Sequence, residues 1–280
     1  MSIFTRCRSN YFIKNFIDKF KIEIDIFYDN IRLIIFFIFV LLYIASTIGR
    51  NLAYYRSIQQ PRLKDLGFEI IPELPNNLKF ISEVINITNL VIGVLITFSP
   101  LYFKPMKNSL SLILIAIRLM TILGIGHLIR IFMYLSTSLP SPADHCQPGS
   151  DNYNPPTSLV KVFTRFSSFK DLNCGDLIFS GHMFQSISFT TVSCVYSYRI
   201  FKILFSKIIS IIQILLSLLQ SYFIIAARNH YSIDIIVAIY VSATLWYISF
   251  IKFPVDEEMK IVDMKKRQQV TNSIQDDFPL

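Results

Sequence analysis

The chain has 280 residues, of which 52% are hydrophobic and only 16% are charged, with a formal net charge of +8. A soluble domain of this length normally carries more charge, and here the apolar residues gather in blocks of about twenty, enough to cross a hydrocarbon core of roughly 30 Å. The composition therefore excludes an ordinary soluble protein and indicates an integral membrane protein, in which excess Lys and Arg mark cytosolic loops and anionic lipid rather than nucleic acid.

The predicted elements begin with a basic, partly amphipathic segment that lacks the compact apolar core and cleavage site of a signal peptide. Six candidate spans follow, and the fourth is the least hydrophobic: 32–49, 80–103, 109–135, 177–197, 203–227 and 233–252. We predict an all-α polytopic membrane protein with six transmembrane helices. Its parts are a cytosolic N-terminal segment (1–30), a six-span catalytic domain (31–252) and a polar cytosolic tail (253–280).

The distribution of Lys and Arg gives an orientation. With the N-terminus in the cytosol, the tails and the short turns after spans two and four hold about sixteen Lys and Arg, against about eight in the two long loops. Both tails are therefore expected to be cytosolic. In this topology span three ends, span four begins, and spans five and six meet at the non-cytosolic side.

The four histidines all lie in or beside this non-cytosolic half, at His127, His145, His182 and His230. Titratable groups inside a span are costly, so they usually face a polar cavity or a partner. For a single histidine, an interhelical hydrogen bond is the commoner explanation. The neighbours of two of them favour chemistry instead.

His230 and Asp234 are four residues apart and share one face of a helix. A carboxylate on one imidazole nitrogen fixes the tautomer and leaves the other nitrogen free as nucleophile or base. His182 is a candidate general acid toward a leaving oxygen. Ser180 and Gly181 precede it, and there a hydroxyl and closely approaching backbone N–H groups favour an anion.

Two arginines, Arg130 and Arg228, are candidate phosphate ligands because guanidinium matches phosphate in a bidentate manner. Two histidines, a carboxylate and arginines, without a serine elbow or cysteine nucleophile, indicate phosphoryl transfer through a histidine. We expect no cofactor and no metal, because the chain lacks close-spaced ligand motifs such as H-E-x-x-H or paired CxxC.

Three further polar positions allow two interpretations each. Asp176 is a head-group contact or a helix N-cap. Cys146 and Cys174 both fall in the non-cytosolic loop before span four, where they form a disulfide or remain two buried free thiols.

Two segments, "CGDLIFSGH" (174–182) and "HYSIDIIVA" (230–238), resemble the two active-site motifs of the sphingomyelin synthase-like family of ceramide phosphotransferases, a membrane branch of the type-2 phosphatidic acid phosphatase superfamily. "PRLKDLGFEIIPELP" (61–75) and "RIFMYLSTSLPSPADHC" (130–146) look like two further family motifs, so the resemblance covers roughly 30–252. The flanks look more like plant and protist inositol phosphorylceramide synthases, because Arg228 and Asn229 stand where animal enzymes have a His-Glu pair.

The resemblance implies a phosphatidic acid phosphatase type-2-like helical bundle with His230 as nucleophile, polarised by Asp234, and His182 as acid–base residue. It further implies ceramide and a glycerophospholipid as substrates, and a luminal or exoplasmic site in the Golgi or plasma membrane. The head group (inositol, choline or ethanolamine) and association of the chain into a homo-oligomer stay open. Two alternatives remain: a lipid phosphate phosphatase, and a non-catalytic lipid transporter or scramblase.

Overall fold

The computed structural model describes residues 16–17, 19–28, 30–57, 59–103, 110–165, 174–256, 260–265, 267 and 271. The predicted basic turn at 104–108 and most of the two predicted tails lie outside these residues. The described residues contain no β-strand. The expectation of an all-α fold is therefore confirmed.

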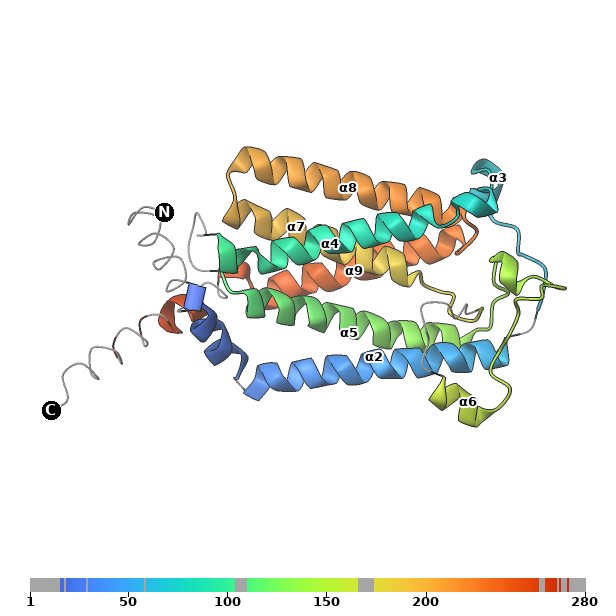
Figure 1. Cartoon of the computed structure of the whole chain (residues 1–280), viewed down its shortest axis with the longest axis horizontal. Coiled ribbons are helices and arrows are strands. Elements are labelled where there is room, and N and C mark those ends of the chain that lie inside the picture. The colour runs from blue at the N-terminus through green and yellow to red at the C-terminus, as the bar shows by residue number, and fades with distance from the viewer. Residues whose placement is uncertain are drawn as a thin grey trace, which may run out of the picture.

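In the described residues, six long helices lie side by side in a bundle (Figure 1). They are α2 (Asn30–Arg56), α4 (Ile81–Tyr102), α5 (Leu112–Ser136), α7 (Gly181–Ile200), α8 (Ile203–Ala226) and α9 (Ser232–Lys252). Short helices occupy the loops: α3 (Leu66–Ile70), α6 (Leu159–Thr164) and the 3₁₀ turns η1 (Asn76–Leu78) and η2 (Asp144–Cys146). Because the long helices alternate in direction, the start of α2 and the end of α9 lie at the same end of the bundle.

Five of these helices are long and apolar enough to cross a membrane, namely α2, α4, α5, α8 and α9. The helix that does not meet this description is α7, which has 20 residues and contacts α4, α5, α8 and α9. Its position inside the bundle is compatible with the predicted fourth span. The chain is an integral membrane protein, while the count of six spans stays a prediction.

The weak hydrophobicity of α7 has a structural reason. Several of its buried hydroxyl residues bond to α4 and α8: the hydroxyls of Thr190 and Ser217 are 2.7 Å apart, and the Asn89 amide donates to Ser186. Such contacts hold membrane helices together where the hydrophobic effect does not. A helix surrounded by other helices can therefore carry polar residues that a lipid-facing helix cannot.

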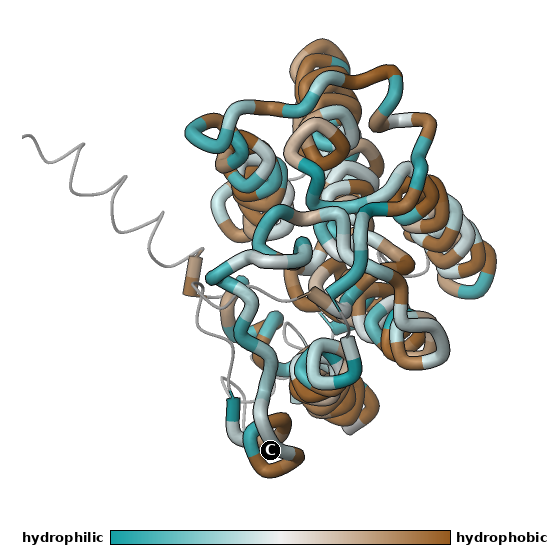
Figure 2. Tube along the Cα trace, turned by 90° about the vertical axis from the view of Figure 1, so that its right-hand side faces the viewer, coloured by the Kyte–Doolittle hydropathy of each residue, from teal (hydrophilic) through white to brown (hydrophobic). Residues whose placement is uncertain are grey.

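The longer loops gather at the end of the bundle opposite to the start of α2, and we call residues 57, 59–80, 137–165, 174–180 and 227–231 the loop end. Viewed from this end, hydrophilic loops cross in front of helices whose outer faces are largely hydrophobic (Figure 2). The loop end is the side that the charge distribution predicts to be non-cytosolic.

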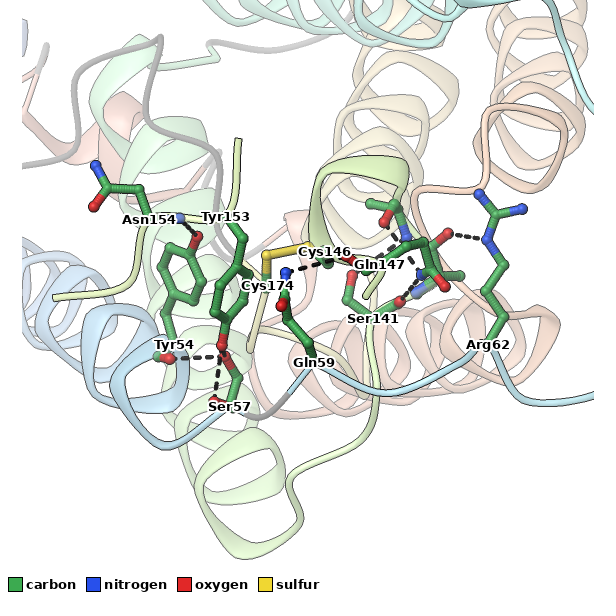
Figure 3. The surroundings of a disulfide bond; sticks show 12 residues. Tyr54, Ser57, Gln59, Arg62, Ser141, Cys146, Gln147, Tyr153, Asn154 and Cys174 are labelled. Atoms are coloured by element: carbon green, nitrogen blue, oxygen red, sulfur yellow. Dashed lines mark hydrogen bonds between the residues drawn. A yellow bond between two sulfur atoms is a disulfide. The ribbon is translucent and has the colours of Figure 1, made fainter. Parts of the chain in front are cut away.

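A disulfide between Cys146 and Cys174 ties η2 to the segment that leads into α7 (Figure 3). The pair is buried beside Tyr54 of α2, and the Cα atoms are 5.6 Å apart. Gly175 allows this close packing, because a Cβ at that position would collide with the backbone of Ala53. Of the two arrangements that the sequence left open for these cysteines, the structure contains the disulfide.

Candidate active site

The first part of the site is the pair formed by His230 and Asp234. Asp234 lies in the first turn of α9, whereas His230 lies just before the helix and not on its face as the spacing predicted. The Asp234 side chain is fully buried, and its Oδ2 lies 3.2 Å from His230 Nδ1 and accepts the backbone N–H of Tyr231 at 3.1 Å. A carboxylate only accepts, so Nδ1 carries the proton in this contact and the neutral ring keeps a free lone pair on Nε2. The predicted nucleophile therefore has a fixed orientation.

Asp234 also joins the two sequence motifs. Its Oδ1 accepts the backbone N–H of Ile178 at 3.0 Å, and its carbonyl oxygen accepts the N–H of Ser180 at 3.1 Å. The segment that carries His182 is thus attached directly to the carboxylate that orients His230. The 174–182 and 230–238 motifs form one unit in space.

Arg130 of α5 holds the same segment from a third helix. Its Nε donates to the Phe179 carbonyl at 2.8 Å, and Nη2 contacts the Asp176 carbonyl at 3.1 Å and carboxylate at 3.0 Å. Gly181 permits this approach, because a Cβ there would lie 2.8 Å from Arg130 Nη1.

Ser180 is the N-cap of α7 and accepts the N–H of Met183 at 3.3 Å, which satisfies one of the free donors of the helix terminus.

The charge on Asp176 follows from this arrangement. Burial alone would raise the pKa of Asp176, but the positive charges of Arg130 and Arg50 and the hydrogen bond from Arg130 outweigh burial and lower it. The group is therefore ionised at neutral pH. Asp176 acts here as a partner of Arg130 and does not cap α7.

His182 has a partner that the sequence analysis missed. Its Nε2 lies 3.3 Å from Oε2 of Glu83, in the first turn of α4, and the two side chains are 39% and 50% exposed. A carboxylate at this distance orients the imidazole. The available signal was a single acid, Glu83, near the start of the second predicted span, at the same predicted membrane face as His182.

A cavity of about 100 Å³ opens beside His182 between α2, α5 and α7. Its lining residues are Tyr43, Ser46, Thr47, Arg50, His127, Arg130, Asp176, Gly181, His182 and Gln185. Four residues predicted from the sequence therefore meet at one cavity: Arg130, Asp176, Gly181 and His182. His230 and Asp234 are not among its lining residues and reach the same segment through the contacts of Asp234.

Arg228 takes a different place from Arg130. It follows α8 in the left-handed conformation (φ 59°), and its guanidinium donates to the carbonyls of Ile71 at 2.9 Å, Ile225 at 3.1 Å and Phe68 at 3.3 Å. It also stacks on the Phe68 ring at 4.3 Å. Its observed role is to fasten the first loop to the turn before His230, and its predicted phosphate contact stays a prediction.

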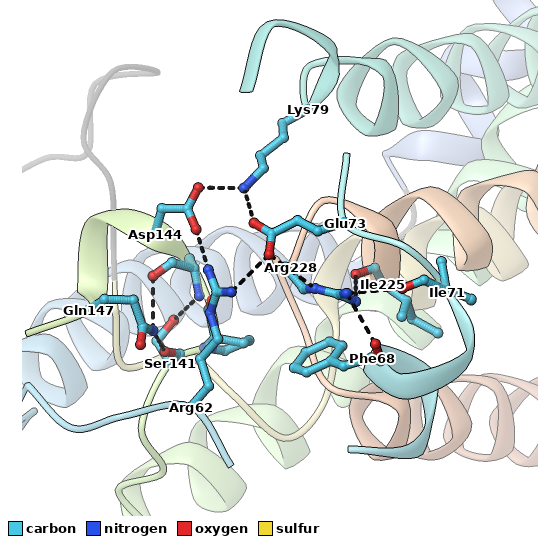
Figure 4. A network of polar contacts seen from close by, with 12 residues as sticks. Arg62, Phe68, Ile71, Glu73, Lys79, Ser141, Asp144, Gln147, Ile225 and Arg228 are labelled. Carbon is cyan, nitrogen blue, oxygen red and sulfur yellow. Dashed lines mark hydrogen bonds and ion pairs between the residues drawn. The ribbon is translucent and has the colours of Figure 1, made fainter. Parts of the chain in front are cut away.

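An ion-pair cluster extends this attachment across the loop end (Figure 4). Glu73 contacts Lys79 at 2.7 Å, Arg62 at 2.9 Å and Arg228 at 3.6 Å, and both Arg62 and Lys79 also pair with Asp144. Burial would raise the pKa of Glu73, but its hydrogen bonds to Lys79 and Arg62 and their charges lower it below 4.5. The cluster joins the first loop to the loop before α7.

The motif at 61–75 also holds the N-terminus of α9 directly. Asp65 accepts the backbone N–H of Ser232 at 3.0 Å and its hydroxyl at 2.7 Å. The Tyr231 hydroxyl donates to the Pro140 carbonyl at 2.8 Å and accepts the N–H of Leu63 at 3.1 Å. The residues on either side of His230 are thus fixed by the first loop.

Comparisons with known proteins identify the relatives of this chain. A family model described as PAP2 superfamily C-terminal matches residues 173–251, the range that holds both histidine motifs. The chain is 30% identical over 262 residues to phosphatidylinositol:ceramide inositolphosphotransferase 2 of Arabidopsis thaliana, which covers 92% of this chain and 80% of that protein. It is 29% identical over 245 residues to a phosphatidylinositol:ceramide inositolphosphotransferase of Oryza sativa subsp. indica, covering 86% and 70%. With sphingomyelin synthase-related 1 of Caenorhabditis elegans it shares 28% over 194 residues, covering 66% and 37%.

Proposed function

The chain belongs to the sphingomyelin synthase-like family of sphingolipid synthases, and from this premise we propose that it transfers a phospho-head group from a glycerophospholipid to the primary hydroxyl of ceramide, releasing diacylglycerol. The head group is phosphoinositol or phosphocholine. Relatives named phosphatidylinositol:ceramide inositolphosphotransferase support phosphoinositol. The observation that carries the proposal is the Asp234 carboxylate, which orients His230 and at the same time binds the segment of His182.

In the first half of the proposed reaction, His230 Nε2 attacks the donor phosphorus. The bond from phosphorus to the diacylglycerol oxygen breaks, and His182 gives its proton to that oxygen. A phosphohistidine diester remains. The buried Asp234 stabilises the positive charge that develops on the His230 ring, at a contact distance of 3.2 Å.

In the second half, ceramide replaces diacylglycerol. His182, now neutral, takes the proton from the primary hydroxyl of ceramide, whose oxygen attacks phosphorus and breaks the bond to His230. Glu83 stabilises His182 each time that it is protonated, since the pair lies at 3.3 Å. One acid–base residue thus serves both halves.

The negative charge of the transferred phosphate is stabilised by groups at the N-terminus of α7. Arg130 lies beside Gly181, the first residue of α7, and the positive end of the helix dipole adds to its charge. An arginine and a helix N-terminus together stabilise the negative charge on the phosphoryl oxygens in the transition state. Asp176 keeps the Arg130 guanidinium in position for this role.

The site is proposed to face the lumen of the Golgi or the outside of the plasma membrane, with both tails cytosolic. The disulfide supports this side, because such bonds persist in oxidising compartments and are rare in the cytosol. The orientation also follows the bias of Lys and Arg toward the predicted cytosolic segments.

Purified protein in mixed micelles with fluorescent ceramide tests the proposal. We expect a phosphorylated ceramide product with at least one of phosphatidylinositol, phosphatidylcholine or phosphatidylethanolamine, and no product with His230→Ala. Water as acceptor, with head-group phosphate released and ceramide unchanged, would instead identify a phosphatase. Full transfer by His230→Ala would refute the phosphohistidine mechanism.

A further inference from the structure

Arg50, Arg130 and Arg228 lie around the candidate site, and they differ in their hydrogen-bond partners. Arg130 is held by Phe179 and Asp176, and Arg228 is held by loop carbonyls. Within the described part of the chain, Arg50 of α2 has a single hydrogen bond, to Thr47 Oγ1 at 3.4 Å, and its Nε is buried without a partner. Among the residues that the structure describes, none forms an ion pair with Arg50. A buried guanidinium donor without a partner is costly, so its place at the cavity wall indicates that a ligand supplies the acceptor.

The cavity that Arg50 lines has a distinct chemistry. Its walls carry the hydroxyls of Ser46 and Thr47, the amide of Gln185 and the two guanidinium groups of Arg50 and Arg130. The carboxylate in this wall, Asp176, is already engaged by Arg130. The cavity therefore offers hydrogen-bond donors and positive charge to whatever enters it.

This chemistry discriminates between phospholipid head groups. A polyol hydroxyl both donates and accepts, so an inositol-type ring matches a wall of hydroxyls, amide and guanidinium. A choline or ethanolamine cation meets net positive charge here. Quaternary ammonium groups are normally bound by several aromatic faces, whereas Tyr43 is the aromatic ring in this wall, with the imidazoles of His127 and His182 beside it.

We propose that this cavity is the head-group subsite of the phospholipid donor, and that Arg50 is a specificity-determining residue that selects an uncharged polyhydroxy head group over choline or ethanolamine. The inference rests on the proposed function, in which the donor phosphorus lies between His230 and His182. Because His182 lines the cavity, the head group extends past it toward Arg50. In this proposal the diacylglycerol moiety of the donor and ceramide bind outside the cavity, so Arg50 acts on the donor head group alone.

Steady-state kinetics with three donors test this assignment. For Arg50→Gln we expect KM for phosphatidylinositol to rise about tenfold or more, the equivalent of about 1.4 kcal/mol or more, with KM for ceramide unchanged. Arg50→Lys keeps the positive charge but loses the bidentate guanidinium, so its KM for phosphatidylinositol is expected to lie between those of the unmodified protein and Arg50→Gln. Arg50→Glu is expected to raise the rate with phosphatidylcholine relative to phosphatidylinositol by about tenfold. The matched control is Arg56→Gln on the same helix, where the exposed Arg56 donates to the Leu135 carbonyl outside the cavity.

A binding measurement distinguishes a failure of the head-group subsite from a failure of the proposed function. In protein with His230→Ala, native mass spectrometry of the detergent complex counts bound phosphatidylinositol against phosphatidylcholine, and adding Arg50→Gln is expected to abolish the preference. If Arg50→Gln abolishes the binding preference, the head-group subsite is supported, whatever the transfer assay gives. If the unmodified protein transfers nothing to ceramide, only the proposed function is refuted. Unchanged donor KM and unchanged binding, or equal losses with all three donors, would overturn the role of Arg50.

Discussion

Replacing Asp234 by Asn removes the group on which the candidate site is built. The carboxylate accepts three hydrogen bonds, from His230 Nδ1, the Tyr231 N–H and the Ile178 N–H, at 3.2, 3.1 and 3.0 Å, with no exposure to solvent. Asparagine has nearly the same shape but offers one acceptor oxygen. Its NH₂ group must therefore face at least one of these three donors.

The size of the effect follows from which donor the NH₂ group faces. If it faces the N–H of Ile178, a buried donor is left unsatisfied at a cost of about 1–3 kcal/mol in stability. If it faces His230, the ring turns to the tautomer that carries its proton on Nε2 and loses the nucleophilic lone pair. Either way the charge that stabilises the imidazolium is lost, and we expect kcat to fall by about 10²- to 10⁴-fold.

The assay is transfer to fluorescent ceramide by purified Asp234→Asn in mixed micelles, with kcat and KM measured separately and thermal unfolding recorded in the same detergent. The control is Asp256→Asn, which removes an exposed carboxylate that pairs with Arg199 at 3.0 Å near the end of α9. We expect this control to keep its kcat. A kcat for folded Asp234→Asn within about threefold of the unmodified protein would refute the reasoning, because no oriented imidazole would then be needed.

Three further perturbations have expected outcomes. Glu83→Gln removes the partner of His182, so kcat is expected to fall about tenfold with little change in KM, and an unchanged kcat would contradict the pairing. Replacing Cys146 and Cys174 by Ser opens a loop with a sequence separation of 28, which is expected to cost about 3.5 kcal/mol in thermal unfolding and to make the stability insensitive to reductant. Because the pKa of Glu73 is lowered below 4.5, its contribution is present above that value and is lost as pH falls through the lowered pKa. The melting temperature is therefore expected to drop more for the unmodified protein than for Glu73→Gln between about pH 6 and about pH 3.5.

The parts of the site that lie close together in sequence were predictable. His230 and Asp234 are four residues apart, and this short separation predicted that they meet, although His230 lies just before α9 and reaches Asp234 in the first turn of that helix. The alternation of the predicted spans also brought His182 and His230 to one end of the bundle, where the structure has them, while the side of the membrane stays a prediction. The contact between Glu83 and His182 was not predictable. It depends on how α4 packs against α7, and no local sequence pattern indicates that packing.

Residue type proved a weaker guide than backbone geometry for the arginines. Arg130 and Arg228 were equivalent candidates in the sequence, yet the left-handed turn after α8 aims Arg228 at the carbonyls of the first loop. Arg50 carried no signal beyond being basic at the end of a span. Its significance arises only because α5 and α7 close a cavity beside it.

The environments of the two histidines differ in a way that suits the proposed two-step transfer. The His230 side chain is 7% exposed and is backed by a carboxylate that solvent does not reach, so water has little access to a phosphoryl group bound to it. The His182 side chain is 39% exposed beside Glu83, where leaving and entering hydroxyl groups can exchange protons with it. Reversing the two environments would expose the intermediate to hydrolysis and isolate the acid–base residue from both alcohols. The asymmetry therefore supports His230 as nucleophile and His182 as proton carrier on physical grounds that are independent of the motifs.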